Sequence, residues 1–143
     1  MPSGELLAVA SLPTIAVMPP IEKLVYVRVV ATTDGGSAFE DDVLSLTMTE
    51  IVAGVPPMSV GAMSSTAPVT YLRSDAFDSE PHPAPRCQWV VMLRGEIDVT
   101  TSDGECRRFG PGDLLMVTDT DGSGHTTSAA GRPPFEALFI PVS

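Results

Sequence analysis

Proline and glycine interrupt this chain so often that long helices have almost no room in it. The 143 residues include 14 prolines and 12 glycines, spaced so that few windows could hold a long helix. Between them lie short β-branched or alternating runs at 24–30, 43–49, 69–72, 89–94, 96–101, 114–117 and 135–140. Short strands at close spacing with turn signals between them are typical of a sandwich or barrel, so the sequence predicts an all-β fold.

Three glycine-containing segments predict how the strands connect. The segment Ser102-Asp-Gly-Glu105 separates two runs and predicts a hairpin with a type I′ turn, because Asp-Gly tolerates positive φ. Gly110-Pro-Gly-Asp113 predicts a second tight turn that leads into a buried strand. Gly95 interrupts what would otherwise be one long strand, and it predicts a bulge or a sharp corner.

The first part of the chain is less regular. Residues 34–42 form a polar stretch with one aromatic, Phe39, and residues 55–68 are small, apolar and irregular. Neither stretch could build a core of its own. We therefore interpret 1–143 as a single domain, with 1–68 as an N-terminal arm and first strands and 69–143 as the core.

Composition and charge limit the classes of binding partner and the cellular compartment that we expect. A net charge of −10 disfavours nucleic acid, which requires clustered Lys and Arg. No stretch approaches the roughly 20 apolar residues that span a bilayer, and the first residues lack the basic region of a secretory signal. Cys87 and Cys106 make neither a disulfide framework nor a C-x-x-C motif. We expect a cytoplasmic protein with reduced thiols.

The chain has only two histidines, and each lies at the edge of a strand-like run. His82 precedes the run 88–94, and His125 follows the run 114–117. Histidine is the side chain most often used for metal ligation and for acid–base chemistry near neutral pH. Both residues are therefore candidates for a functional site.

The stretch that contains them resembles the cupin superfamily, and most closely its small single-domain bacterial members. The resemblance covers about the C-terminal 60% of the chain. The segments that carry it are His82-Pro-Ala-Pro-Arg-Cys-Gln88, Leu93-Arg-Gly-Glu96, Ser102-Asp-Gly-Glu105, Phe109-Gly-Pro-Gly-Asp113 and Gly124-His125. It implies a double-stranded β-helix, or jelly-roll, barrel. It leaves the reaction open, because cupins include oxygenases, isomerases, epimerases, decarboxylases and non-catalytic binders.

The resemblance also implies a metal site, from which this chain departs. A full cupin site has three histidines and one carboxylate. Here His82 and His125 take the first and last positions, with a longer gap before His125 than the motif has, and Ala84 and Gln88 replace the middle ligands. The implied metal set is His82, Gln88 and His125, which should hold Fe, Mn, Zn or Ni only weakly, if at all. Glu80 could restore a negative charge, although its spacing fits no motif.

Further residues are candidates for the pocket. Strand alternation places Gln88, Val90 and Met92 on one face and Trp89, Val91 and Leu93 on the other. Arg86 shares the parity of Gln88, so it could neutralise a substrate carboxylate or enolate, or pair with a surface acid. The expected substrate-binding residues, each of which could instead be ordinary core, are Met92, Trp89, Met58, Met63 and Phe39.

The acidic pairs carry the weakest functional signal. Asp41-Asp42 and Asp119…Asp121 lie in predicted turns, where the default is a solvated or capping role.

Two classes of function remain open. The first is an enzyme that performs proton transfer on an apolar carbonyl-containing metabolite: an isomerase, cyclase or lyase. His82 and His125 would be its acid and base, or hold a weakly bound metal, and Gln88 with Arg86 would stabilise negative charge. The second is a non-catalytic binder with a decayed metal site. A dioxygenase stays open if Glu80 or water completes the coordination. A homodimer is expected, since an exchanged or packed N-terminal strand would cover a sheet edge.

Overall fold

The computed structural model describes residues 22–63, 65–75, 78–132 and 134–142. By its internal contacts the chain divides into two compact units. The described part of the smaller unit comprises 22–24 and 45–61, and its strands β3 (Thr47–Thr49) and β4 (Met58–Val60) form an antiparallel hairpin. The larger unit comprises 25–44 and the described residues from 62 onward.

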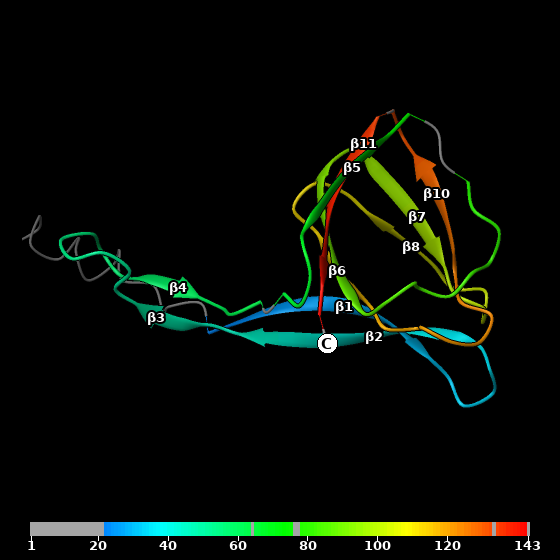
Figure 1. The fold of residues 1–143 in the computed structure, drawn as a ribbon, viewed down its shortest axis with the longest axis horizontal. Coiled ribbons are helices and arrows are strands. Elements are labelled where there is room, and N and C mark those ends of the chain that lie inside the picture. Colours follow the sequence, from blue (N-terminus) through cyan, green and yellow to red (C-terminus); the bar gives the residue numbers. More distant parts are fainter. Residues whose placement is uncertain (1–21, 64, 76–77, 133, 143) are drawn as a thin grey trace, which may run out of the picture. The chain divides into compact units, whose positions relative to one another are not determined.

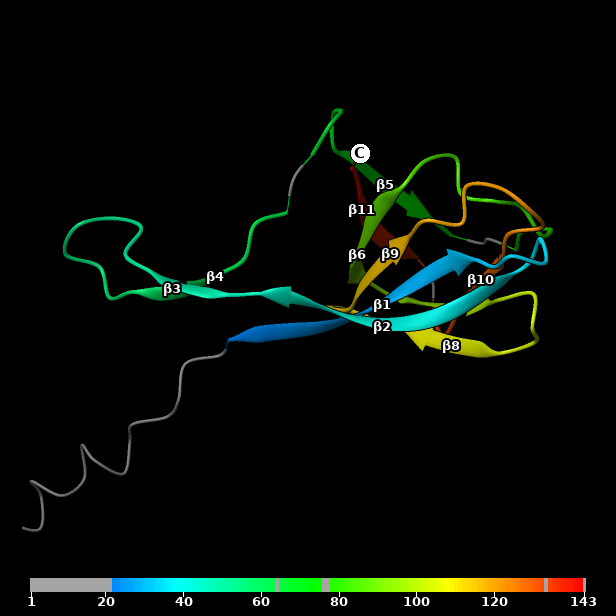
Figure 2. The same ribbon diagram turned by 90° about the horizontal axis from the view of Figure 1, so that it is seen from below.

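The larger unit is built from a six-stranded and a three-stranded sheet (Figures 1 and 2). The strand order is β2-β1-β9-β6-β11-β5 in the first sheet and β10-β7-β8 in the second. The strands are β1 (Lys23–Ala31), β2 (Ser37–Ser45), β5 (Thr70–Ser74), β6 (Gln88–Arg94), β7 (Glu96–Thr100), β8 (Cys106–Phe109), β9 (Leu114–Val117), β10 (Thr126–Ala130) and β11 (Phe135–Pro141). No helix in the described part of the chain is long and apolar enough to cross a membrane.

The all-β prediction is confirmed, and the closed barrel is not. The two sheets form a sandwich that is compatible with a jelly-roll, and β2, β5, β8 and β10 are edge strands, beyond which the described residues contain no further strand. Closure of a barrel requires an unbroken ladder of hydrogen bonds around it. Here that ladder is interrupted at these four edge strands, where the two sheets end.

Gly95 lies at the corner between β6 and β7, where the chain passes from the large sheet to the small one, as the sequence predicts. Its φ is +72°, and a Cβ at this position would lie 2.6 Å from the carbonyl oxygen of Pro134. Only glycine combines that conformation with so close an approach of another backbone. The chain therefore leaves the large sheet after Arg94 and enters the small sheet at Glu96.

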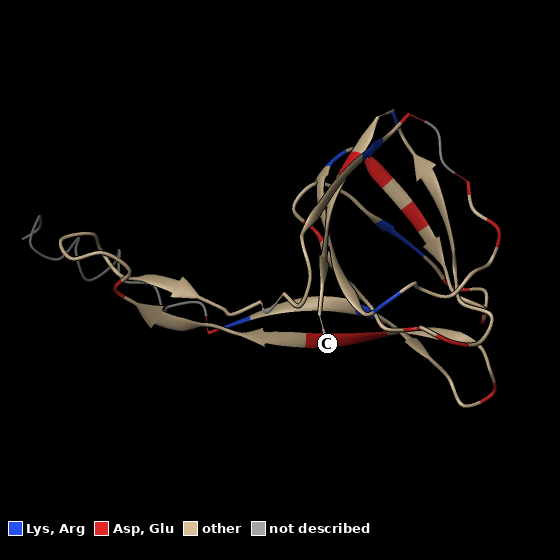
Figure 3. Ribbon diagram, in the orientation of Figure 1, with Lys and Arg blue, Asp and Glu red and all other residues tan. Residues whose placement is uncertain are grey.

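Alternation along the strands creates the core between the sheets. On β7 the acidic side chains Glu96 and Asp98 alternate with the buried Ile97 and Val99, which gives the banded strand in Figure 3. Arg108 on β8 donates hydrogen bonds of 2.8 and 3.0 Å to Asp98, and these hold the pKa of the Asp98 carboxyl below its usual value. The inward face is apolar and the outward face is charged.

The β7–β8 hairpin is present, but its turn is not of type I′. That type requires positive φ at two successive residues, and among the described non-glycine residues none has positive φ. Gly104 alone is left-handed, its N–H donates to the Thr101 carbonyl at 2.9 Å, and the Thr101 N–H donates to Glu105. This is the pattern of a three-residue loop that ends on a left-handed glycine.

Strand β4 lies in the stretch 55–68, which was expected to be irregular, and two further strands were not expected either. Residues 37–42, predicted as a polar loop, form the first part of β2, where Asp42 binds Tyr26 and Arg28 of β1. Acidic side chains suit an edge strand because they deter pairing with other chains. The second is β10, whose small residues carry no strand pattern and which pairs with β7 throughout its length. The predicted strand 43–49 is divided between β2 and β3.

The first strand pairs within its own chain. In the described structure β1 runs parallel to β9, with Val27 opposite Leu115 and Val29 opposite Val117. Exchange of this strand between subunits, and the homodimer itself, stay predictions. Residues 1–21 of the expected N-terminal arm lie outside the described residues.

Candidate functional site

A cavity of about 470 Å³ lies between the two sheets of the larger unit. Among the strands, β5, β6, β7, β9 and β11 form its apolar wall, which includes Val90, Met92, Ile97, Leu115 and Phe135. The polar lining residues are Ser74, His82, Gln88, His125 and Thr127. Among the described residues that line the cavity there is no Lys, Arg, Asp or Glu. Such a space favours an uncharged, mainly apolar ligand.

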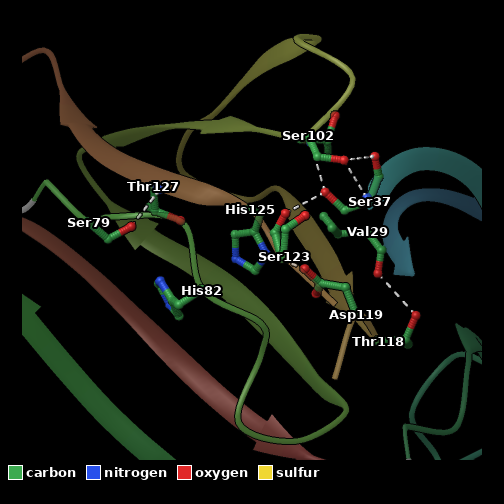
Figure 4. Close-up of polar contacts among 12 residues, drawn as sticks. Val29, Ser37, Ser79, His82, Ser102, Thr118, Asp119, Ser123, His125 and Thr127 are labelled. Carbon is green, nitrogen blue, oxygen red and sulfur yellow. Dashed lines mark hydrogen bonds and ion pairs between the residues drawn. The ribbon is translucent and has the colours of Figure 1, made fainter. Parts of the chain in front are cut away.

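His82 and His125 meet at this cavity through their backbones. Each donates its N–H to the carbonyl of the other, at 3.1 Å, so the pair forms an isolated antiparallel bridge. Directly opposed residues in such a bridge project to the same side. The imidazole centroids are accordingly 5.5 Å apart, with the ring planes inclined by 42° (Figure 4). The expectation that the two histidines act together is compatible with this geometry.

A buried carboxylate lies behind His125. Asp119 is 0% exposed, and its Oδ2 is 2.5 Å from His125 Nδ1. His125 is itself 8% exposed. A carboxylate partner fixes the tautomer with hydrogen on Nδ1, which leaves Nε2 as the nitrogen available to a ligand. It also stabilises the imidazolium when the ring takes up a proton.

His82 is held by a different partner. Its Nδ1 lies 2.9 Å from the backbone carbonyl oxygen of Glu80, so Nδ1 carries the hydrogen here too. The residue is exposed, whereas His125 is buried. The contact made by Glu80 is thus through its main chain, and the charge beside the histidines comes from Asp119.

The prediction that Asp119 is a solvated or capping turn residue is therefore wrong. Its backbone carbonyl accepts from Ala84, its Oδ2 contacts His125, and its Oδ1 is buried with no hydrogen-bond partner among the described residues. The signal that could have identified it is its place two residues after the buried strand β9, in the segment that leads to His125. A chain that has just left a buried strand can keep the next side chains inside.

The other predicted residues divide between the cavity and its surroundings. Gln88, 5% exposed, and Met92, 1% exposed, line the cavity with Val90, which confirms the predicted alternation of β6. Arg86 is exposed and is not among the residues that line it.

The remaining aromatic and methionine candidates lie elsewhere. Trp89 is on the opposite face of β6, where its ring centroid is 4.5 Å from that of Tyr26. Phe39 packs near Phe109, with the Arg107 guanidinium 4.7 Å above its ring. Met63 is half-buried outside the cavity lining, and Met58 is half-exposed on β4 of the smaller unit.

The position of Trp89 leads to a first prediction. It is the only tryptophan of the chain and is 4% exposed, packed away from the cavity. Its fluorescence should change on unfolding and stay constant when the cavity is saturated with a non-absorbing apolar ligand. The measurement is a fluorescence titration with cyclohexanol, with Met92→Trp in a Trp89→Phe background as the control that should respond. A response of Trp89 equal to that of the control would contradict its placement.

The donor set does not fit the metal site that the cupin resemblance implies. Ala84, at the position of a ligand, is buried in the cavity wall and offers no donor. Within the described ranges no three His, Cys, Asp or Glu residues are grouped to hold an ion. Two imidazole Nε2 atoms and one neutral amide remain, a set that lacks a charged ligand.

Comparison with known proteins adds no family. No protein-family model matches the chain, and no curated protein is significantly similar to its sequence.

Proposed function

We propose that this protein is a cupin-type cytoplasmic enzyme that transfers a proton on a neutral, largely apolar carbonyl compound, as an isomerase, cyclase or lyase does. One observation carries the proposal: a histidine backed by a fully buried carboxylate at the wall of an apolar cavity. An imidazole oriented in this way is a competent general base near neutral pH.

In the proposed reaction the base is His125. Its Nε2 removes a proton from the carbon next to the carbonyl, and Asp119 stabilises the imidazolium that forms. The amide of Gln88 donates a hydrogen bond to the carbonyl oxygen, where negative charge develops. His82 is the second acid–base group: protonated on Nε2, it returns a proton to the enolate at carbon or oxygen. The number of protons on enzyme and substrate together is conserved.

The surroundings favour a neutral substrate. The described cavity lining contains no Lys or Arg that could pair with a carboxylate or phosphate, and Arg86 lies outside it. An anion transferred into this apolar space would lose its hydration without compensation. We therefore expect uncharged ketones to bind in preference to the corresponding acids.

The test is exchange of carbon-bound protons in deuterium oxide, followed by proton NMR. A suitable probe is β-tetralone, an uncharged bicyclic ketone with acidic α-protons. We expect the protein to accelerate exchange by about a hundredfold over buffer, the lower range for one positioned base. His125→Ala should remove the acceleration. No acceleration with saturating ketone would refute the enzymatic proposal.

A second candidate is a non-catalytic binder of apolar molecules. The replacement of two expected ligands by Ala84 and Gln88 favours it. Its signature would be saturable binding of β-tetralone without exchange. Stoichiometric metal that is lost in both His82→Ala and His125→Ala would instead favour the dioxygenase alternative.

A further inference from the structure

The segment that carries Asp119 and His125 is hydrogen-bonded to β1, to the turn that follows it and to the start of β2. At its start, the backbone carbonyl of Val29 accepts from the N–H of Thr118 at 2.8 Å and from its hydroxyl at 3.0 Å. Near its end, the carbonyl of Gly35 accepts from the N–H of Ser123 at 2.8 Å. The 118–125 segment is thus attached at both ends to residues that precede it by more than eighty positions.

The attachment nearest to the histidine is made by a side chain. Ser37, the first residue of β2, is 1% exposed, and its hydroxyl donates to the carbonyl of Gly124 at 2.7 Å (Figure 4). The same hydroxyl accepts from the backbone N–H of Ser102 at 2.9 Å. Because this buried hydroxyl both donates and accepts a hydrogen bond, its orientation is fixed.

This contact controls one peptide group. The carbonyl of Gly124 and the N–H of His125 belong to the same planar peptide. Ser37 binds the carbonyl at 2.7 Å, and the carbonyl of His82 binds the N–H at 3.1 Å. A peptide held at both ends cannot rotate about the chain, so the direction in which the Cα–Cβ bond of His125 leaves the backbone is set.

We propose that Ser37 is a positioning residue for His125: its buried hydroxyl fixes the Gly124–His125 peptide and keeps the imidazole on Asp119. The importance of that position for catalysis rests on the proposed function, but the positioning itself does not. Ser102 assists, because its hydroxyl accepts from the Ser37 N–H at 2.7 Å and so holds the start of β2 in place.

The test is heteronuclear NMR of the free protein with labelled histidine. Only two ring systems are present, and His82→Gln identifies the signal of His125. In Ser37→Ala the buried carbonyl of Gly124 loses its donor, so the segment should open more often. Exchange of the His125 Nδ1 hydrogen with water should become about tenfold faster, the effect expected for one unmatched buried group. The fraction of the tautomer with hydrogen on Nδ1 should fall.

Ser123→Ala is the matched control. The Ser123 hydroxyl is exposed and reaches Gly35 at 3.2 Å, while its backbone N–H makes the shorter bond to the same carbonyl. Its removal should leave the exchange of the His125 hydrogen within about twofold of the unmodified protein, as for most surface substitutions. A folded Ser37→Ala protein with unchanged exchange and tautomer would overturn the proposal.

A second pair of variants covers the case in which Ser37→Ala does not fold. Ser37→Thr keeps the hydroxyl, and Ser37→Val replaces it by a methyl group of the same shape. The added methyl is common to both, so only the hydroxyl separates them. We expect slow exchange in Ser37→Thr and fast exchange in Ser37→Val, and equal rates would refute the inference. Because no ketone is present, failure of this test is distinct from failure of the tetralone experiment.

Discussion

Replacement of Asp119 by Asn should lower ketone proton exchange by about a hundredfold, to the rate in buffer, while the protein remains folded. Asparagine has nearly the shape of aspartate and lacks its charge. The carboxylate holds hydrogen on His125 Nδ1 across 2.5 Å. An amide can present its NH₂ group there, which reverses the tautomer and leaves Nε2 carrying a hydrogen. A base in that state cannot accept the substrate proton.

The comparison that isolates this effect lies in the same segment. Asp121 is exposed, two residues beyond the fully buried Asp119. Asp121→Asn removes the same charge from the same loop, and it should leave β-tetralone exchange within about twofold of the unmodified protein. Equal rates for Asp119→Asn and the unmodified protein would show that the carboxylate has no part in the reaction.

The strands of the core could be predicted because their tertiary contacts favour the same structure as their local sequence pattern. The run 114–117 is buried on β9, and the alternation of Gln88, Val90 and Met92 is that of the cavity wall. In both, apolar side chains are spaced as a strand requires, and tertiary contacts only reinforce the local preference. The corner at Gly95 was predictable for the same reason.

The strands that were missed depend on their partners. The Thr, Ser and Ala residues of β10 have no periodic apolar face, and the strand exists because β7 supplies its hydrogen bonds. The acidic stretch in β2 is compatible with a strand because Arg28 and Tyr26 of β1 contact Asp42. Pairing with distant residues overrides weak local preference.

The candidate site was predicted in part for a related reason. A motif could identify His82 and His125, since their spacing from the turns is local. A motif could not identify Asp119, because the role of this residue in the site depends on its burial and on its contact with His125. An aspartate between threonines has the same sequence signature whether it faces water or a histidine.

Gly124→Ala should be the most destabilising single substitution near the site. Gly124 has a φ of +71°, and a Cβ there would lie 2.0 Å from the carbonyl oxygen of His82. That oxygen accepts the N–H of His125, so it cannot move without breaking the bridge between the histidines. We expect a loss of about 3–5 kcal/mol in the free energy of unfolding, or no folded protein, from combined strain and overpacking.

Gly104→Ala separates the clash from the backbone strain. Gly104 has a φ of +90°, and a Cβ there would meet nothing within 4 Å. It therefore incurs only the cost of a left-handed alanine, about 1–2 kcal/mol. Urea unfolding followed by the fluorescence of Trp89 measures both variants. If both lose the same free energy, the close approach of Gly124 to His82 contributes nothing to stability. A clearly larger loss in the free energy of unfolding for Gly124→Ala would mean that the bridge between His82 and His125 leaves no room for a side chain at position 124. The backbone would then fix the spacing of the two imidazoles.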